Sequence, residues 1–215
     1  MAGRYFVYPD PQFDQRTDTA DALRRLTAAL VGHAADDASL ARIASWARDV
    51  AADVEQGERL ERGADYQARR YLDPPPEDGD ELISFSDRPV SGPANASALD
   101  LRIRREGREA VGVAIFDRRF EASPNRSHGG ITAACFDDVM GYVNIIDAVA
   151  AYTLELHVRY VAPMPLHVPV EFRARTVERS ERRSTVTAEA TAPDGTRVGE
   201  ASAVFAIVAR EKFGI

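Results

Sequence analysis

The chain has 215 residues, a formal net charge of −7 and one cysteine, Cys135. One cysteine excludes an internal disulfide, and the length suits one core of ordinary domain size plus an extension. The acidic balance argues against a nucleic-acid partner. We find neither a charged-then-apolar leader nor an apolar run long enough to span a bilayer, so we expect a soluble, cytoplasmic protein without membrane contact.

Two amphipathic helices are predicted at the start of the chain. Apolar residues recur at helical spacing from Asp18 to Val31 and again from Leu40 to Val54, with Arg, Asp and Glu between them. The prolines and glycine of Tyr71–Asp80 cannot continue a helix. We therefore expect three parts, namely a helical extension (1–70), a linker (71–90) and a second domain (91–215). The extension is expected to pack on the second domain or on a partner subunit, and a lid over a pocket is the sharper alternative.

Alternating apolar and polar residues predict an antiparallel sheet in the second domain. Two strands flank Gly107 as a hairpin, over Leu99–Arg105 and Ala110–Phe120. Four more strands follow a helix, over 153–160, 168–174, 185–191 and 198–208, with Asp194-Gly195 as a hairpin signal. In the strand 153–160, the apolar face holds Leu154, Leu156, Val158 and Tyr160, and the polar face holds Thr153, Glu155, His157 and Arg159.

The helix between the two sets of strands runs from Ile131 to Ile146. Nearly all of its residues are apolar or small, so we expect a curled sheet to bury it on all sides. Asp137 and Asp138 interrupt this apolar surface about two turns in, beyond the reach of the helix dipole. A buried carboxylate costs several kcal/mol unless it is paired, hydrogen-bonded or neutralised. The acids therefore indicate chemistry, and the alternative is one solvated acid and one locally paired acid on an interface helix.

Paired glycines precede this helix, in the order His128-Gly129-Gly130. Glycines have no side chain, so these amides can approach a ligand oxygen at the positive end of the helix. The pattern predicts an oxyanion hole, and a tight entry turn is the simpler alternative.

The segment 128–141 resembles a motif of the hotdog-fold acyl-CoA thioesterases. It contains a His-Gly-Gly triplet, six apolar or small residues, two acids and a glycine. The branch that it resembles in particular is related to the phenylacetate-pathway (PaaI-like) thioesterases. The chain matches at His128, Gly129, Gly130, Asp137, Asp138 and Gly141, and again at Val158-Arg159-Tyr160, Pro163 and Pro165. The resemblance covers about residues 91–210. It implies an α+β hotdog fold, in which a curled antiparallel sheet wraps one central helix, here with an N-terminal helical extension.

The resemblance also implies an acyl-CoA thioesterase. Asp137, nine positions after His128, is then the catalytic carboxylate, and the Gly129 amide polarises the thioester carbonyl. Asp137 acts as a general base on water or as a nucleophile, and the sequence does not separate these routes. The role of Asp138 is less settled. His128 is expected to fix the loop geometry, and Asn95 to hold water or substrate as in relatives, with a simple turn residue as the alternative.

Neither a cofactor nor a metal ion is expected, because CoA enters as part of the substrate. CoA is strongly anionic and the chain is acidic, so local arginines must hold its phosphates. The candidates are Arg126, Arg159, Arg173 and Arg175, each with a solvated strand face as the alternative. Relatives commonly carry arginine where this chain has Ala162, so an acyl carrier protein remains a possible carrier.

The resemblance implies a homodimer or a dimer of dimers, with acyl-CoA bound along the interface. Ala133, Ala134 and Gly141 permit close helix approach, and Gly141 then lies beside the substrate. Two other classes of protein stay open. A non-hydrolytic acyl-CoA sensor would keep the fold and pocket without needing Asp137, and an assembly subunit would act through the N-terminal helices.

Several other chemistries lack their motifs. The sequence contains none of the Gly-x-Ser-x-Gly, His-Glu-x-x-His, Cys-x-x-Cys and phosphate-loop patterns. Cys135 is expected to pack in the core rather than act as a nucleophile.

Overall fold

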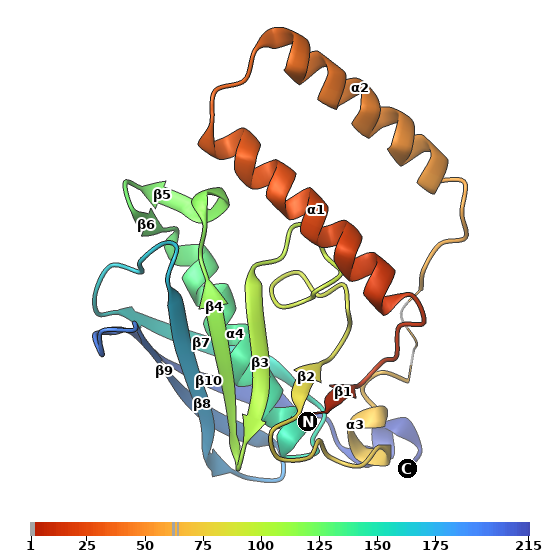
Figure 1. Cartoon of the computed structure of the whole chain (residues 1–215). Helices are drawn as coiled ribbons and strands as arrows, with labels where there is room; N and C mark the ends of the chain where they lie inside the picture. Colours follow the sequence, from red (N-terminus) through yellow and green to blue (C-terminus); the bar gives the residue numbers. More distant parts are fainter. Residues whose placement is uncertain (1–2, 62, 64) are drawn as a thin grey trace.

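A computed structural model describes residues 3–61, 63 and 65–215 of the chain (Figure 1). Its α-helices are α1 (Phe13–Gly32), α2 (Asp37–Val54), α3 (Arg69–Leu72) and α4 (Gly129–Ile146), with 3-10 turns η1 (Arg118–Phe120) and η2 (Arg210–Phe213). Its strands are β1 (Arg4–Phe6), β2 (Glu81–Ile83), β3 (Asp100–Glu106), β4 (Glu109–Ile115), β5 (Glu121–Ser123), β6 (Arg126–Ser127), β7 (Ala151–Tyr160), β8 (Pro169–Arg179), β9 (Arg183–Thr191) and β10 (Arg197–Ile207).

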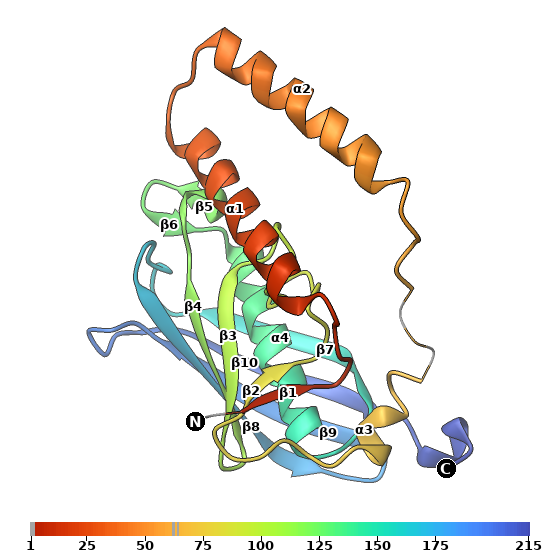
Figure 2. The ribbon, with the colours of Figure 1, turned by 45° about the vertical axis from the view of Figure 1, so that its right-hand side comes forward.

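One sheet wraps the helix α4. The strand order is β1-β2-β3-β4-β8-β9-β10-β7, and every pair is antiparallel except β1 with β2. The sheet curls so that α4 lies in its hollow, as the two ribbon views show (Figures 1 and 2). The predicted α+β hotdog fold, with helices N-terminal to it, is confirmed.

The core lies between α4 and the inner face of the sheet. Phe136 of α4 meets Phe172 of β8 edge to face, with ring centroids 5.0 Å apart, and both side chains are fully buried. Gly112 of β4 allows the closest approach, because a Cβ atom there would lie 2.7 Å from Cγ2 of Val139. This packing sets the distance between α4 and the sheet.

The sheet does not bury α4 on all sides, so that expectation is wrong. A stripe of small residues and one acid stays half-buried or exposed along the helix, namely Gly130, Ala133, Ala134, Asp137 and Gly141. The stripe is uncovered because the sheet ends at β7, which pairs with β10 on one edge and has no partner strand on the other within the described chain. Tyr152, Leu154 and Tyr160 of β7 are 57%, 54% and 55% exposed.

The N-terminal segments differ in part from the predicted elements. Both amphipathic helices are confirmed, and α1 packs beside η1 while α2 lies beyond α1, away from the sheet (Figure 1). Strands β1 and β2 extend the sheet from segments expected to be a helical extension and a linker. Each of these two strands has three residues, which are too few to show the alternation of a strand in the sequence. The division of the chain into three parts stays a prediction.

The second predicted strand also ends early. β4 stops at Ile115, and the Asp117 side chain accepts a hydrogen bond from the Arg119 amide at 2.8 Å to begin η1. Within the described residues, the helices are all too short or too polar to cross a membrane.

Candidate active site

The first part of the site is the N-terminus of α4. His128 is the N-cap residue, and its Nδ1 atom accepts a hydrogen bond from the Gly130 amide at 3.0 Å. The Gly129 amide has no acceptor among the residues that the structure describes. Tyr160 of β7 donates its hydroxyl to the Gly129 carbonyl at 2.9 Å and holds this turn. Gly129 is therefore the open N–H donor at the positive end of the helix. The role of His128 in fixing the loop stays a prediction, and its hydrogen bond to the Gly130 amide is consistent with that role.

The second part of the site is Asp137. This half-buried carboxylate lies on the uncovered stripe of α4, and Thr153 of β7 donates its hydroxyl to Asp137 Oδ1 at 2.9 Å. The other carboxylate oxygen is left to accept a proton or to attack a carbonyl. A carboxylate that is oriented by a hydroxyl and open on one side suits a general base or a nucleophile.

A β-bulge places Thr153 beside Asp137. Val204 of β10 pairs with Glu155 of β7 and Phe205 pairs with Thr153, so Leu154 is the extra residue. An extra residue reverses the alternation of the strand and re-aims the side chain before it. Thr153 therefore turns to α4, and its predicted place on the polar face with Glu155 is wrong. The alternation pattern carries no sign of this bulge, which is why the sequence did not reveal Thr153.

Asp138 has a different environment. It is 3% exposed and forms an ion pair with Arg88, whose guanidinium also lies over the Tyr142 ring at 5.3 Å. Burial opposes the charge on Arg88, but the Asp138 carboxylate outweighs it and raises the pKa of the guanidinium. The alternative expected one solvated acid and one locally paired acid, whereas here Asp138 is paired and Asp137 is half-buried and accepts from Thr153. The partner is not local, however, because Arg88 lies 50 positions away in the sequence.

Asn95 closes the loop that carries Arg88. Its Nδ2 atom donates to the carbonyls of Asp87 at 3.1 Å and Arg88 at 3.3 Å, and its Oδ1 atom accepts from the Ser97 amide at 2.8 Å. Both side-chain N–H groups are thus used within the loop. These contacts are those of a turn residue, the alternative for Asn95, and a role with water or substrate stays a prediction.

The candidate arginines separate into two groups. Arg126 of β6 is exposed, has no ion-pair partner in the described chain and lies two residues before His128. Arg173 of β8 lies between Glu109 and Glu106, at 2.8 Å from each, and hydrogen bonds to these acids raise its pKa. Its neighbours Phe172 and Ala174 point into the core, so Arg173 lies on the outer face of the sheet, away from α4.

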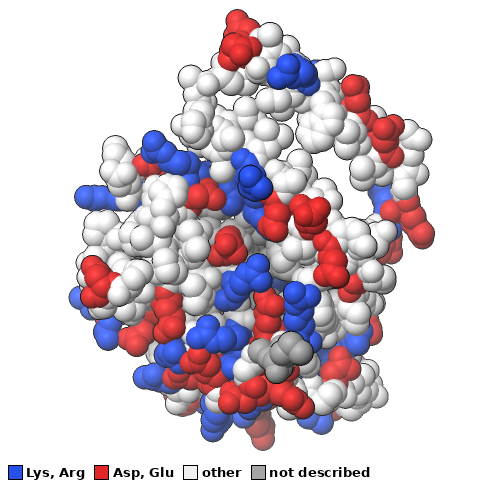
Figure 3. Space-filling view, in the orientation of Figure 1, with Lys and Arg blue, Asp and Glu red and all other residues white. Residues whose placement is uncertain are grey.

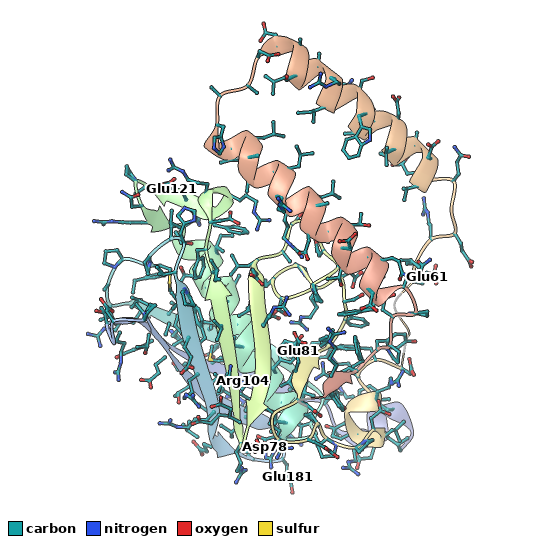
Figure 4. All side chains as sticks on the ribbon, viewed as in Figure 1. Glu61, Asp78, Glu81, Arg104, Glu121 and Glu181 are labelled. Carbon is teal, nitrogen blue, oxygen red and sulfur yellow. The ribbon has the colours of Figure 1, made fainter. Side chains whose placement is uncertain are left out.

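The outer face of the sheet is covered by interleaved charges (Figure 3). Arg175 pairs with Glu109 at 3.4 Å and Arg159 with Glu200 at 3.3 Å on this face. Glu81 and Arg104 are register partners on β2 and β3 of the same sheet (Figure 4). The structure therefore brings neither Arg173 nor Arg175 to the α4 stripe, and among the residues it describes Arg126 has no ion-pair partner and lies next to the glycine turn.

The comparisons with known proteins agree with this fold. Residues 125–199 match the family model of the thioesterase superfamily, a segment that holds α4, β7, β8, β9 and the start of β10. A comparison with curated proteins finds no match. A solved structure described as a thioesterase superfamily protein is 23% identical with a TM-score of 0.78, and the alignment covers 95% of this chain and 96% of that chain. This likeness shows the fold, with the N-terminal helices included.

Two smaller solved structures align with about half of the chain. The smu.793 protein of Streptococcus mutans UA159, bound to acetyl CoA, is 18% identical with a TM-score of 0.48, over 51% of this chain and 88% of that chain. The E. coli PaaI protein from the phenylacetic acid degradation operon is 13% identical with a TM-score of 0.44, over 46% and 75%. The thioesterase superfamily is the level that the matched segment supports, and the narrower PaaI-like branch stays a prediction.

Proposed function

We propose that this protein is a thioester hydrolase that converts an acyl-CoA into CoA and a free acid. Asp137 is the catalytic carboxylate, the Gly129 amide polarises the thioester carbonyl and Thr153 orients Asp137. The observation that carries the proposal is the pairing of an open helix N-terminal amide with a hydroxyl-oriented, half-buried carboxylate on one uncovered face of α4. The thioesterase superfamily match over the same segment supports it.

The chemistry follows from these groups. The Gly129 N–H and the helix dipole stabilise the oxyanion that forms when the thioester carbonyl is attacked. The Oδ2 atom of Asp137 either takes a proton from the attacking water or attacks the carbonyl itself. A thiol with a pKa of about 8.5 leaves readily as the thiolate, so the reaction needs no strong general acid.

We propose that two copies of the chain form each site. Gly129 and Asp137 are eight residues apart in one helix, which corresponds to about 12 Å along its axis. One thioester carbonyl cannot reach both groups of a single helix. A second α4, antiparallel to the first across the uncovered stripe, places its Asp137 near Gly129 of its neighbour, and the small residues of the stripe permit that approach. The open, apolar edge of β7 favours the same dimer.

Thiol release from short, long and aromatic acyl-CoAs tests the proposal. We expect Asp137→Asn to lower kcat by three orders of magnitude or more, and Thr153→Val to lower kcat by about 10- to 100-fold while Thr153→Ser keeps it. If wild-type protein binds acyl-CoA but releases no thiol, the protein is an acyl-CoA sensor and the proposal that it is a hydrolase fails.

Cys135 does not disturb an assay that detects released thiol. Burial raises the pKa of the Cys135 thiol, so this cysteine does not react with a thiol reagent in the folded protein.

A further inference from the structure

A polar cluster with three buried members and two half-buried ones joins the N-terminal extension to α4 on the side of the helix away from the proposed site. Its members are Tyr66, Arg70, Ser84, Arg88 and Asp138, and Arg70, Ser84 and Asp138 are 9%, 0% and 3% exposed. Arg70 donates to the Tyr66 hydroxyl, and Tyr66 lies 2.8 Å from Ser84 Oγ. Both guanidiniums reach that same serine oxygen, Arg88 at 3.3 Å and Arg70 at 3.4 Å.

At the Tyr66 and Ser84 hydroxyls, hydrogen atoms exceed acceptors, while Asp138 Oδ2 at the other end of the cluster has no hydrogen-bond partner among the described residues. The Tyr66 oxygen receives an N–H group from Arg70, and the Ser84 oxygen receives one from each arginine. If both hydroxyls kept their protons, only one of the two O–H groups could donate across the contact between the Tyr66 and Ser84 oxygens. The other O–H group would have no acceptor among the described residues. Removing the Tyr66 proton deletes one donor and supplies a stronger acceptor.

The charges of the cluster lead to the same conclusion. Arg70 and Arg88 carry two positive charges, and Asp138 supplies one negative charge. A buried charge without a counter-ion is strongly unfavourable. We propose that Tyr66 is the ionisable partner of Arg70 in this cluster, and that its phenolate, once formed, is the second anion beside Asp138 and fastens residues 65–72 to the helix that carries Asp137.

Each element around Tyr66 contributes to this balance. The charged neighbours are Arg70 from α3, Arg88 from the loop before β3 and Asp138 from α4, while Phe85 stacks on the Tyr66 ring at 4.4 Å between centroids. Burial opposes ionisation of Tyr66, but Arg70, Ser84 and Arg88 outweigh it and lower the pKa of the phenol. Tyr142 of α4 and Tyr5 of β1 are also buried in part or in full, and burial raises the pKa of each. Tyr66 thus differs from its neighbours of the same type.

The test is the tyrosinate absorbance of the full chain as the pH rises. The sequence has seven tyrosines, and we expect one equivalent to ionise at lower pH than the others. Tyr66→Phe removes that early step, and Arg70→Gln, which keeps all seven tyrosines, moves it to higher pH. Tyr8→Phe is the matched control, because Tyr8 stacks on the same Phe85 ring but donates its hydroxyl to Asp65. This control keeps the early step.

Stability against pH gives a second measurement. A phenol with a lowered pKa in the folded state releases its proton before the unfolded phenol does, so its contribution grows up to the ordinary value of about 10. The ratio of the unfolding constants of Tyr66→Phe and wild type therefore rises between neutral pH and pH 10, by up to about tenfold per pH unit. Identical titrations in wild type and Tyr66→Phe, or a ratio that does not change with pH, would overturn the proposal.

Discussion

Two adjacent aspartates have opposite surroundings because a helix turns by about 100° per residue. Asp138 points to the loop that carries Arg88 and is closed off from water, while Asp137 points to the uncovered stripe and meets Thr153. The short distance between them in the sequence therefore says nothing about a shared role. A substitution at Asp138 acts on folding through a buried ion pair, and one at Asp137 acts on the proposed chemistry.

We propose that Arg126 contacts a phosphate of CoA. It is exposed, unpaired in the described chain and close to the glycine turn, whereas Arg159 pairs with Glu200 on the outer face. We expect Arg126→Ala to raise KM for acyl-CoA about tenfold, the value of one charge-assisted hydrogen bond. KM for the same acyl group on pantetheine, which lacks the nucleotide phosphates, stays unchanged. Arg159→Ala is the control, and an equal effect of Arg126→Ala on both substrates would refute the phosphate contact.

At the scale of elements, the glycines of β4 and α4 lie in opposite environments. A Cβ atom at Gly112 would come within 2.7 Å of Val139 and 3.0 Å of Leu101, whereas one at Gly141 meets nothing within 4 Å. We expect Gly112→Ala to lower the free energy of unfolding by about 1–3 kcal/mol through overpacking. Within one copy of the chain, Gly141→Ala should raise it by up to about 1 kcal/mol, because alanine favours a helix. Urea unfolding of both variants, at a protein concentration where sedimentation shows a monomer, measures this, and equal losses would contradict an uncovered stripe at Gly141 in the single chain.

The sequence predicts the long elements of this fold because they have enough residues for a period to show. The helix α4, the pair β3 and β4, and the strands β7 to β10 follow from apolar spacing, and the glycine and acid positions follow from the motif. Strands β1 and β2 are too short for an alternation, and the bulge at Leu154 adds one residue that no pattern marks. The Arg88–Asp138 pair joins residues 50 positions apart, which only the folded chain brings together. Local periodicity thus fixes elements, while contacts between distant residues build the surroundings of the site.

At the scale of the whole molecule, the proposed site needs two copies of the chain, and paired variants test this directly. Gly129→Pro removes the open amide, and proline suits the first position of a helix. Asp137→Asn removes the carboxylate, so each variant alone should release almost no thiol. If one helix supplied both groups to each site, a mixture of the two variants would stay inactive.

The composite arrangement predicts a different outcome for that mixture. A mixed dimer joins one intact Gly129 to one intact Asp137, so one of its two sites has both groups. When the two variants are unfolded together and refolded, half of the dimers are mixed, and activity should recover to about a quarter of the wild-type value. Leu154→Lys puts a charge on the exposed edge of β7, so in the two variants it should abolish this recovery. In the otherwise wild-type chain it should lower both the mass measured by sedimentation and the thioesterase activity. A mixture that stays inactive while it sediments as a dimer would show that Gly129 and Asp137 of different copies do not meet.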